Sequence, residues 1–214
     1  GGQFEAQQSA SQTIMVMGAG VLLIVLLLLS MSINSTKSAI LVMINLPLAL
    51  IGGILAIYLT ATEDVVGNTL ALFGFGEGQY IAPVISIASM VGFVTLFGIA
   101  VRNGILLVNH YQHLMKYEGK SLLDAIKQGS EERLVPILMT ALTAVLGLIP
   151  LAINAGEPGS ELLAPLAIVV LGGLTTSTLL NLVVIPAGYL IIYGRGGSQT
   201  ELVEENKELM LDEY

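Results

Sequence analysis

Long, unbroken runs of apolar residues are the feature that most limits what this chain can fold into. The run from Leu22 to Leu29 reads LLIVLLLL, and comparable runs recur along the sequence. A helix needs roughly 20 mostly apolar residues to cross the hydrocarbon of a bilayer. Charged residues make up only 11% of the chain, whereas an ordinary soluble domain carries about 25%. The chain therefore has to bury much of its apolar surface in a membrane.

We predict an all-α fold: a polytopic transmembrane helix bundle of five spans plus one cytoplasmic interfacial helix. Transmembrane strands are excluded, because no stretch alternates with a period of two residues. A short amphipathic stretch that opens with a capping box at Ser121 is the expected interfacial helix, at about 120–133. The five predicted spans are about 13–32, 38–60, 82–111, 134–153 and 162–193.

The basic residues predict the orientation of the bundle. With five spans the loops alternate sides, and one side holds every Lys and Arg outside the spans: Lys37, Lys116, Lys120, Lys127, Arg133, Arg195 and Lys207. The other side carries only acidic charge. The positive-inside rule then makes residues 1–12 the end of a periplasmic segment, 13–195 the transmembrane domain and 196–214 a cytoplasmic tail. The expected location is a bacterial inner membrane.

Arg102 is the one charged residue inside a predicted span. It lies roughly 12 Å from the cytoplasmic end of the third span, at 1.5 Å per residue. An intramembrane arginine is costly and usually faces a bundle interior and a partner. All 16 acidic residues lie outside the five spans, so we expect the partner carboxylate to come from helices outside this chain. The alternative is that Arg102 extends to the interface or bonds to carbonyls.

Helical spacing adds two polar stripes and a set of small residues. Thr95, Gly98, Arg102, Asn109 and His113 share one face of the third span, and Arg133, Thr140 and Gly147 share one face of the fourth. Small residues spaced by four predict close helix packing. The glycines in these pairs are Gly53, Gly92, Gly104 and Gly173.

No enzymatic motif and no cofactor site is predicted. The chain has no cysteine, which excludes disulfides and thiolate metal sites, and it has no Walker loop, catalytic triad or metalloprotease motif. His110 and His113 are three residues apart and could hold a metal, but no third ligand lies near them in sequence, so we assign no metal site. Nothing indicates nucleic-acid binding.

Several long motifs, in this order, resemble the C-terminal membrane half of resistance-nodulation-division (RND) permeases. They include GFVTLFGIAVRNGILLVNHYQHLM and EPGSELLAPLAIVVLGGLTTSTLLNLVVIPA, of which the latter is most similar to the heavy-metal efflux branch. The opening GGQFE resembles the entry to the eighth of twelve helices. Because the chain starts without Met or a signal pattern, we interpret it as a fragment or one piece of a split protein.

The resemblance implies a secondary active transporter that exports a substrate, here heavy-metal cations, by proton antiport. It implies a homotrimer that works with a periplasmic adaptor, an outer-membrane channel, and the missing porter domains and N-terminal membrane half. Arg102 and Asn103 of VRNGIL match the basic and polar relay positions of the tenth helix, and Arg133 and Thr140 of RLVPILMT match those of the eleventh.

Two alternatives stay open at this point. The substrate of an RND exporter could be a drug or another organic solute, because selection lies mainly in the porter domains. The chain could also be a non-transporting scaffold or remnant subunit. A channel is disfavoured, because no acidic ring or filter motif occurs in the spans. The loop at 61–81 is longer than the usual turn of the family; it could contact the porter domain or be a simple surface insertion.

Overall fold

The structure is a bundle of helices, and the computed structural model describes residues 2–33, 35–75 and 78–194. No strand occurs in these ranges. The helices are α1 (Gly2–Ile33), α2 (Thr36–Met43), α3 (Asn45–Thr60), α4 (Val65–Leu72), α5 (Ile87–Tyr117), α6 (Leu122–Ile153) and α7 (Leu163–Gly194). The predicted tail at 196–214 lies outside the described residues.

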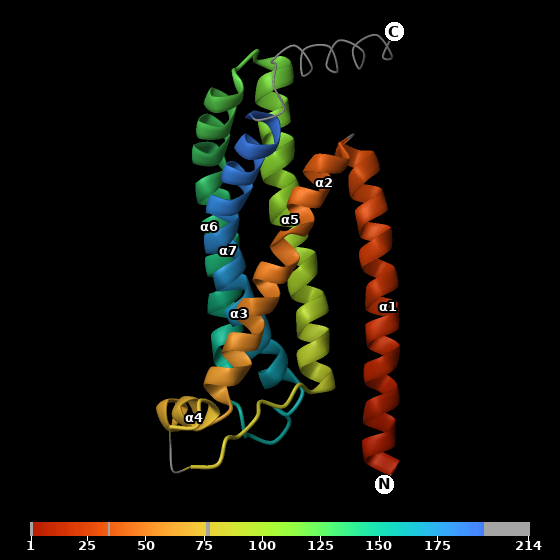
Figure 1. Ribbon diagram of the computed structural model, residues 1–214, viewed down its shortest axis with the longest axis vertical. Helices are drawn as coiled ribbons and strands as arrows, with labels where there is room; N and C mark the ends of the chain where they lie inside the picture. The colour runs from red at the N-terminus through yellow and green to blue at the C-terminus, as the bar shows by residue number, and fades with distance from the viewer. Residues whose placement is uncertain (1, 34, 76–77, 195–214) are drawn as a thin grey trace.

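The five predicted spans are confirmed as helices. Within the described ranges, five helical stretches are long and apolar enough to cross a membrane: α1, α2 with α3, α5, α6 and α7. They run alternately up and down the long axis of the molecule (Figure 1). The described basic residues outside the predicted spans therefore gather at one end of the bundle, and the acidic connections 61–81 and 154–161 lie at the other.

The second span is divided into α2 and α3 because of Pro47. Proline has no amide hydrogen, so the carbonyl of Met43 loses the helical donor four residues on. The helix is interrupted at Ile44, between α2 and α3, although Ile44 keeps helical dihedral angles and its amide still bonds to Ile40 at 3.0 Å. The two pieces remain close to collinear in Figure 1.

Three helices differ in extent from the predicted stretches: α5 begins at Ile87 and ends at Tyr117, whereas 82–111 was expected, and α6 and α1 run further than the sequence pattern indicated. The stretch expected as a separate interfacial helix is the first part of α6, which continues without a break through Pro136. The change from charged to apolar residues at Leu134 resembles a boundary, but a change of polarity does not end a helix. Similarly, α1 begins at Gly2, because the polar residues before Thr13 include no helix breaker.

The core lies where α3, α5 and α7 pack together, and small residues set its spacing. A Cβ atom added at Gly52 would lie 2.7 Å from the carbonyl oxygen of Gly172, which shows how closely the backbones of α3 and α7 approach. Such close packing is how helices associate in lipid. One buried polar contact crosses the same interface: Asn45 donates its side-chain amide to Asn181 at 2.9 Å.

The basic end of the bundle is held by side-chain hydrogen bonds between helices. The Tyr193 hydroxyl, near the end of α7, lies 2.7 Å from both Ser35 and Ser38 at the start of α2. Tyr111 of α5 bonds to Ser130 of α6 at 2.6 Å. These contacts tie α7 to α2, and α6 to α5.

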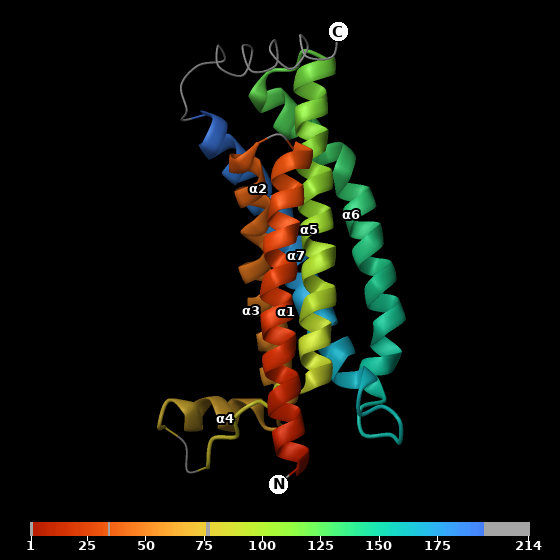
Figure 2. The ribbon, with the colours of Figure 1, turned by 90° about the vertical axis from the view of Figure 1, so that its right-hand side faces the viewer.

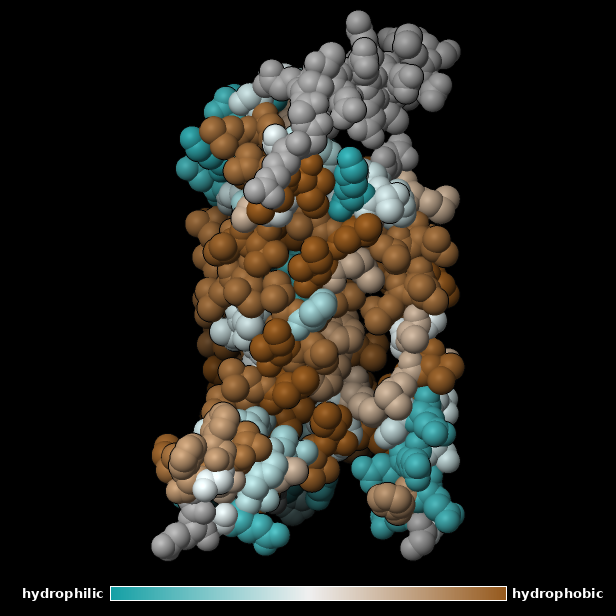
Figure 3. All heavy atoms as spheres, viewed as in Figure 1, coloured by the Kyte–Doolittle hydropathy of each residue, from teal (hydrophilic) through white to brown (hydrophobic). Residues whose placement is uncertain are grey.

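The outer surface matches a bilayer. Figure 3 shows apolar side chains over the middle of the molecule and hydrophilic ones toward both ends. The first helix is the least covered: only Leu29 and Ile33 of α1 are buried, and most of α1 stands apart from the other helices (Figure 1).

Candidate functional site

Arg102 lies at the midpoint of α5, among apolar residues on both sides in sequence. Its side chain is exposed on the surface of the bundle rather than buried between the helices of this chain. No hydrogen bond or ion pair to it is found within residues 2–33, 35–75 and 78–194. The arginine therefore presents an uncompensated positive charge at the middle of a membrane helix.

The polar stripe around Arg102 is uncovered along its whole length. Thr95, Gly98, Asn109 and His113 are all exposed, while the opposite face of α5 packs against other helices. A methyl group added at Gly98 would meet no neighbouring atom within 4 Å. Thr95 uses its hydroxyl only within its own helix, where it donates to Val91 at 3.0 Å. The face is therefore free to receive another helix.

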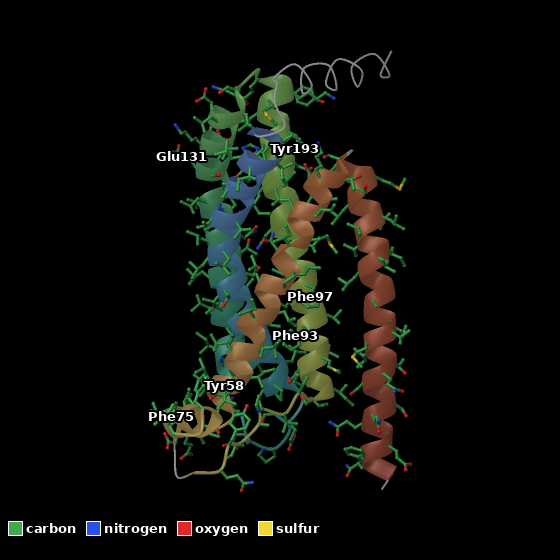
Figure 4. The ribbon with its side chains drawn as sticks, in the orientation of Figure 1. Tyr58, Phe75, Phe93, Phe97, Glu131 and Tyr193 are labelled. Atoms are coloured by element: carbon green, nitrogen blue, oxygen red, sulfur yellow. The ribbon has the colours of Figure 1, made fainter. Side chains whose placement is uncertain are left out.

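An apolar cleft of about 670 Å³ separates α1 from α5 and reaches Arg102. Figure 4 labels Phe93 and Phe97, which lie on α5 at this cleft. Leu50 and Ile54 of α3 line its floor, and Arg102 is the one charged residue among the described residues that line it. The cleft places a single cation at the edge of an otherwise apolar space.

The other relay positions are not brought into contact with Arg102. Asn103 is buried, so its side chain points into the bundle while that of its neighbour points out. Arg133 is half-buried near the charged start of α6. Thr140 is exposed and donates to the carbonyl of Pro136 at 2.9 Å. In the described part of the chain, no hydrogen bond joins any two of these four residues.

The four glycines picked out by spacing lie at helix contacts. A Cβ atom at Gly53 would press on the Phe93 ring, and one at Gly92 would lie 3.1 Å from the carbonyl oxygen of Leu166. At Gly104 it would lie 2.9 Å from Val42, and at Gly173 it would meet Leu96 and the carbonyl of Ala49.

The two histidines do not converge on a common ligand position. His110 pairs with Glu132 of α6 at 2.5 Å. The ring of His113 lies parallel to that of His110, with 6.5 Å between the centroids. No group of three or more His, Cys, Asp or Glu side chains that could hold a metal occurs within the described ranges.

Two features were missed from the sequence. The helix α4 forms inside the loop at 61–81, and Asn45 forms a buried contact with Asn181. A signal existed for each. Asp64 is a preferred N-cap residue and comes directly before an apolar run, and a single asparagine in an apolar run indicates a partner across a helix interface.

Comparison with known proteins agrees with the bundle and its motifs. A family model described as the AcrB/AcrD/AcrF family matches residues 1–75 and 64–193. Protein HelA of Legionella pneumophila is 39% identical over 208 residues, which are 96% of this chain and 18% of HelA. The cobalt-zinc-cadmium resistance protein CzcA of Cupriavidus metallidurans is 37% identical over 97% of this chain and 17% of its own length.

A solved structure shows the same arrangement of helices. The crystal structure of a heavy metal efflux pump matches with a TM-score of 0.66 and 37% identity, over 90% of this chain and 17% of the pump. The chain thus spans less than a fifth of the length of these relatives. Matches of this identity along nearly the whole chain, together with the family model, show that the chain belongs to the AcrB/AcrD/AcrF family.

Proposed function

We propose that this chain is the C-terminal membrane part of a permease that exports heavy-metal cations by proton antiport. The observation that carries the proposal is Arg102, an unpaired cation at the midpoint of α5 on a face that no described helix covers. The substrate class is supported by the relatives named for metal resistance and efflux. The protein is a transporter in this proposal, not an enzyme.

The proposed relay follows from electrostatics. A carboxylate from the missing membrane half would lie against Arg102, whose charge favours the ionised form. Protonation would remove the attraction and let the helix that carries the carboxylate shift against α5. Asn103 is buried beside Arg102 and would hold the local packing, while Arg133 and Thr140 on α6 would contact the same half.

The distribution of charge supports an orientation for the assembly. The described basic residues outside the predicted spans lie at the end of the bundle opposite to α4, and basic residues that flank spans favour the cytoplasmic side. The end with α4 and the start of α1 would then face the periplasm of a bacterial inner membrane. Porter domains, a homotrimer, a periplasmic adaptor and an outer-membrane channel complete the proposed pump.

The test is Arg102→Ala in the full-length protein. We expect proton-driven uptake of zinc, cobalt or cadmium into inverted vesicles to be abolished, because the carboxylate loses its counter-charge. Trimer assembly should be unchanged. Arg102→Lys keeps the charge and should retain part of the export, and Leu106→Ala, one turn away on the same face, should export normally.

Two results would count against the proposal. Wild-type export by Arg102→Ala would remove Arg102 from the relay. If the unmodified protein transported organic solutes but no metal cation, the proposed substrate class would be wrong. The proposed role of Arg102 in the proton relay would be unaffected.

A further inference from the structure

The helix α4 lies crosswise to the long helices and projects from one end of the bundle. Two views agree on this: α4 is seen nearly end-on in Figure 1 and lengthwise in Figure 2. The expectation from sequence was a loop that either contacts the porter domain or is a surface insertion. A third role is open to a helix that lies across the end of a membrane bundle, because such a helix can bind in the bilayer interface.

The helix is capped by one polar contact and held against neighbouring segments by two residue pairs. Asp64 caps it by accepting from the Gly67 amide at 2.8 Å. Tyr58, at the end of α3, lies 2.9 Å from the Thr69 hydroxyl, and Figure 4 shows Tyr58 close above α4. Asn68 is buried and bonds to both the amide and the carbonyl of Ile81, at 2.8 and 3.0 Å. The orientation of α4 is therefore set by the fold.

These contacts leave an apolar stripe uncovered on the side away from Asn68. Val66, Leu70 and Phe73 follow the i, i+4, i+7 spacing of one helix face. They are 70%, 45% and 68% exposed, and Phe75 just beyond them is 82% exposed. A set of large apolar side chains held outward marks an interaction surface rather than a random exposure.

The location of α4 and the charge of the stretch around it indicate what the apolar stripe binds. The end of the bundle that carries α4 lies next to the apolar belt around the middle of the molecule (Figure 3), and the neighbouring end of α3 exposes Leu55 and Leu59. Phenylalanine side chains suit the zone between headgroups and acyl chains. The stretch 61–86 has acidic residues but no Lys or Arg, so attraction to anionic headgroups plays no part.

We infer that α4 is an interfacial anchor whose Val66, Leu70 and Phe73 insert into the neutral lipid at one surface of the bilayer. Lipid is favoured over a protein partner because α4 lies beside the apolar belt of the bundle and beside the exposed Leu55 and Leu59 of α3. The anchor would fix the depth of α3 and of the entry to α5, since Tyr58 and Ile81 connect α4 to both. The inference needs only that the bundle spans a membrane, so it does not depend on the transported substrate.

Spin labelling of the full-length protein in phosphatidylcholine nanodiscs tests the anchor. This chain has no cysteine, so single cysteines can replace Val66, Leu70 and Phe73 once any others in the protein are removed. Leu59 of α3 is the lipid reference and Glu63 the water reference. We expect the ratio of oxygen to nickel-complex accessibility at the three positions to approach that at Leu59 and to exceed that at Glu63 several-fold.

Either of two other results would overturn the inference. Accessibility like that at Glu63 would place the stripe in water. Low accessibility to both reagents would mean that protein covers it, from a second copy or from another domain. Phe73→Trp gives an independent reading without a label: brominated phosphatidylcholine should quench the emission of the new indole. Unquenched emission would contradict insertion.

Discussion

Glycine residues decide how closely the helices approach, and Gly173 shows this at the scale of one residue. A methyl group there would meet the carbonyl oxygen of Ala49 at 3.0 Å and the side chain of Leu96. The backbone of α3 cannot move away without disturbing the Asn45–Asn181 contact on the same interface. The glycine is therefore required by the packing of α3 on α7.

Gly173→Ala is expected to lower the stability of the bundle. Overpacking of a well-packed interior typically costs about 1–3 kcal/mol, and a thermal unfolding curve in detergent should show a lower midpoint. Gly147→Ala on α6 is the matched control. No atom lies within 4 Å of a Cβ at Gly147, so this change should leave the midpoint unchanged or raise it through better helix propensity. Equal effects of the two changes would contradict the packing argument.

Residue patterns predicted some of these sites and missed others for a physical reason. The spacing of small residues identified Gly53, Gly92, Gly104 and Gly173, because helical periodicity places them on contact faces whatever the partner. The same periodicity cannot say which helix lies opposite, so the sequence could indicate that Asn45 has a partner across an interface but not that the partner is Asn181. The roles of Arg102, Asn103, Arg133 and Thr140 remain predictions, because no relay partner for them is found among the described residues.

At the scale of helices, one hydroxyl makes the polar link between α7 and α2. Tyr193 contacts both Ser35 and Ser38 at 2.7 Å. A hydrogen bond of this kind contributes about 0.5–1.5 kcal/mol. Tyr193→Phe should therefore lower the unfolding midpoint and increase hydrogen exchange at the start of α2.

The control for this change is Tyr117→Phe at the end of α5. Tyr117 is 66% exposed and its ring, rather than its hydroxyl, makes the contacts found. Removing its hydroxyl should change neither the midpoint nor the exchange. Unaltered exchange at α2 in Tyr193→Phe would show that the two serines do not hold α2 through this tyrosine.

Hydrophobic length predicted where helices cross the membrane better than where they begin and end. The apolar runs located all five spans. The start of α1, the continuity of α6 through Pro136 and the helix α4 were missed, because hydrogen bonding and capping decide these features and hydropathy does not report them. Pro47 was noted, and the interruption at Ile44 is its direct consequence.

At the scale of the whole molecule, the described helices form a bundle that is closed on one side and open on the other. The closed side joins α3, α5, α6 and α7. The open side comprises the α1–α5 cleft, with Arg102 at its edge. A charge inside a membrane helix is unfavourable without a partner, so the same arginine should affect the isolated chain and the complete permease in opposite ways.

Arg102→Leu tests this difference. In the isolated chain the change removes an unpaired charge, so the unfolding midpoint should stay constant or rise. In the full-length protein the change would leave the partner carboxylate buried without its counter-charge. Breaking such a buried ion pair costs about 3–5 kcal/mol, so the unfolding midpoint should fall. Gly173→Ala, which acts within the chain, should lower both midpoints and so serves as the reference. A fall of equal size in the two proteins would mean that Arg102 has its partner inside this chain.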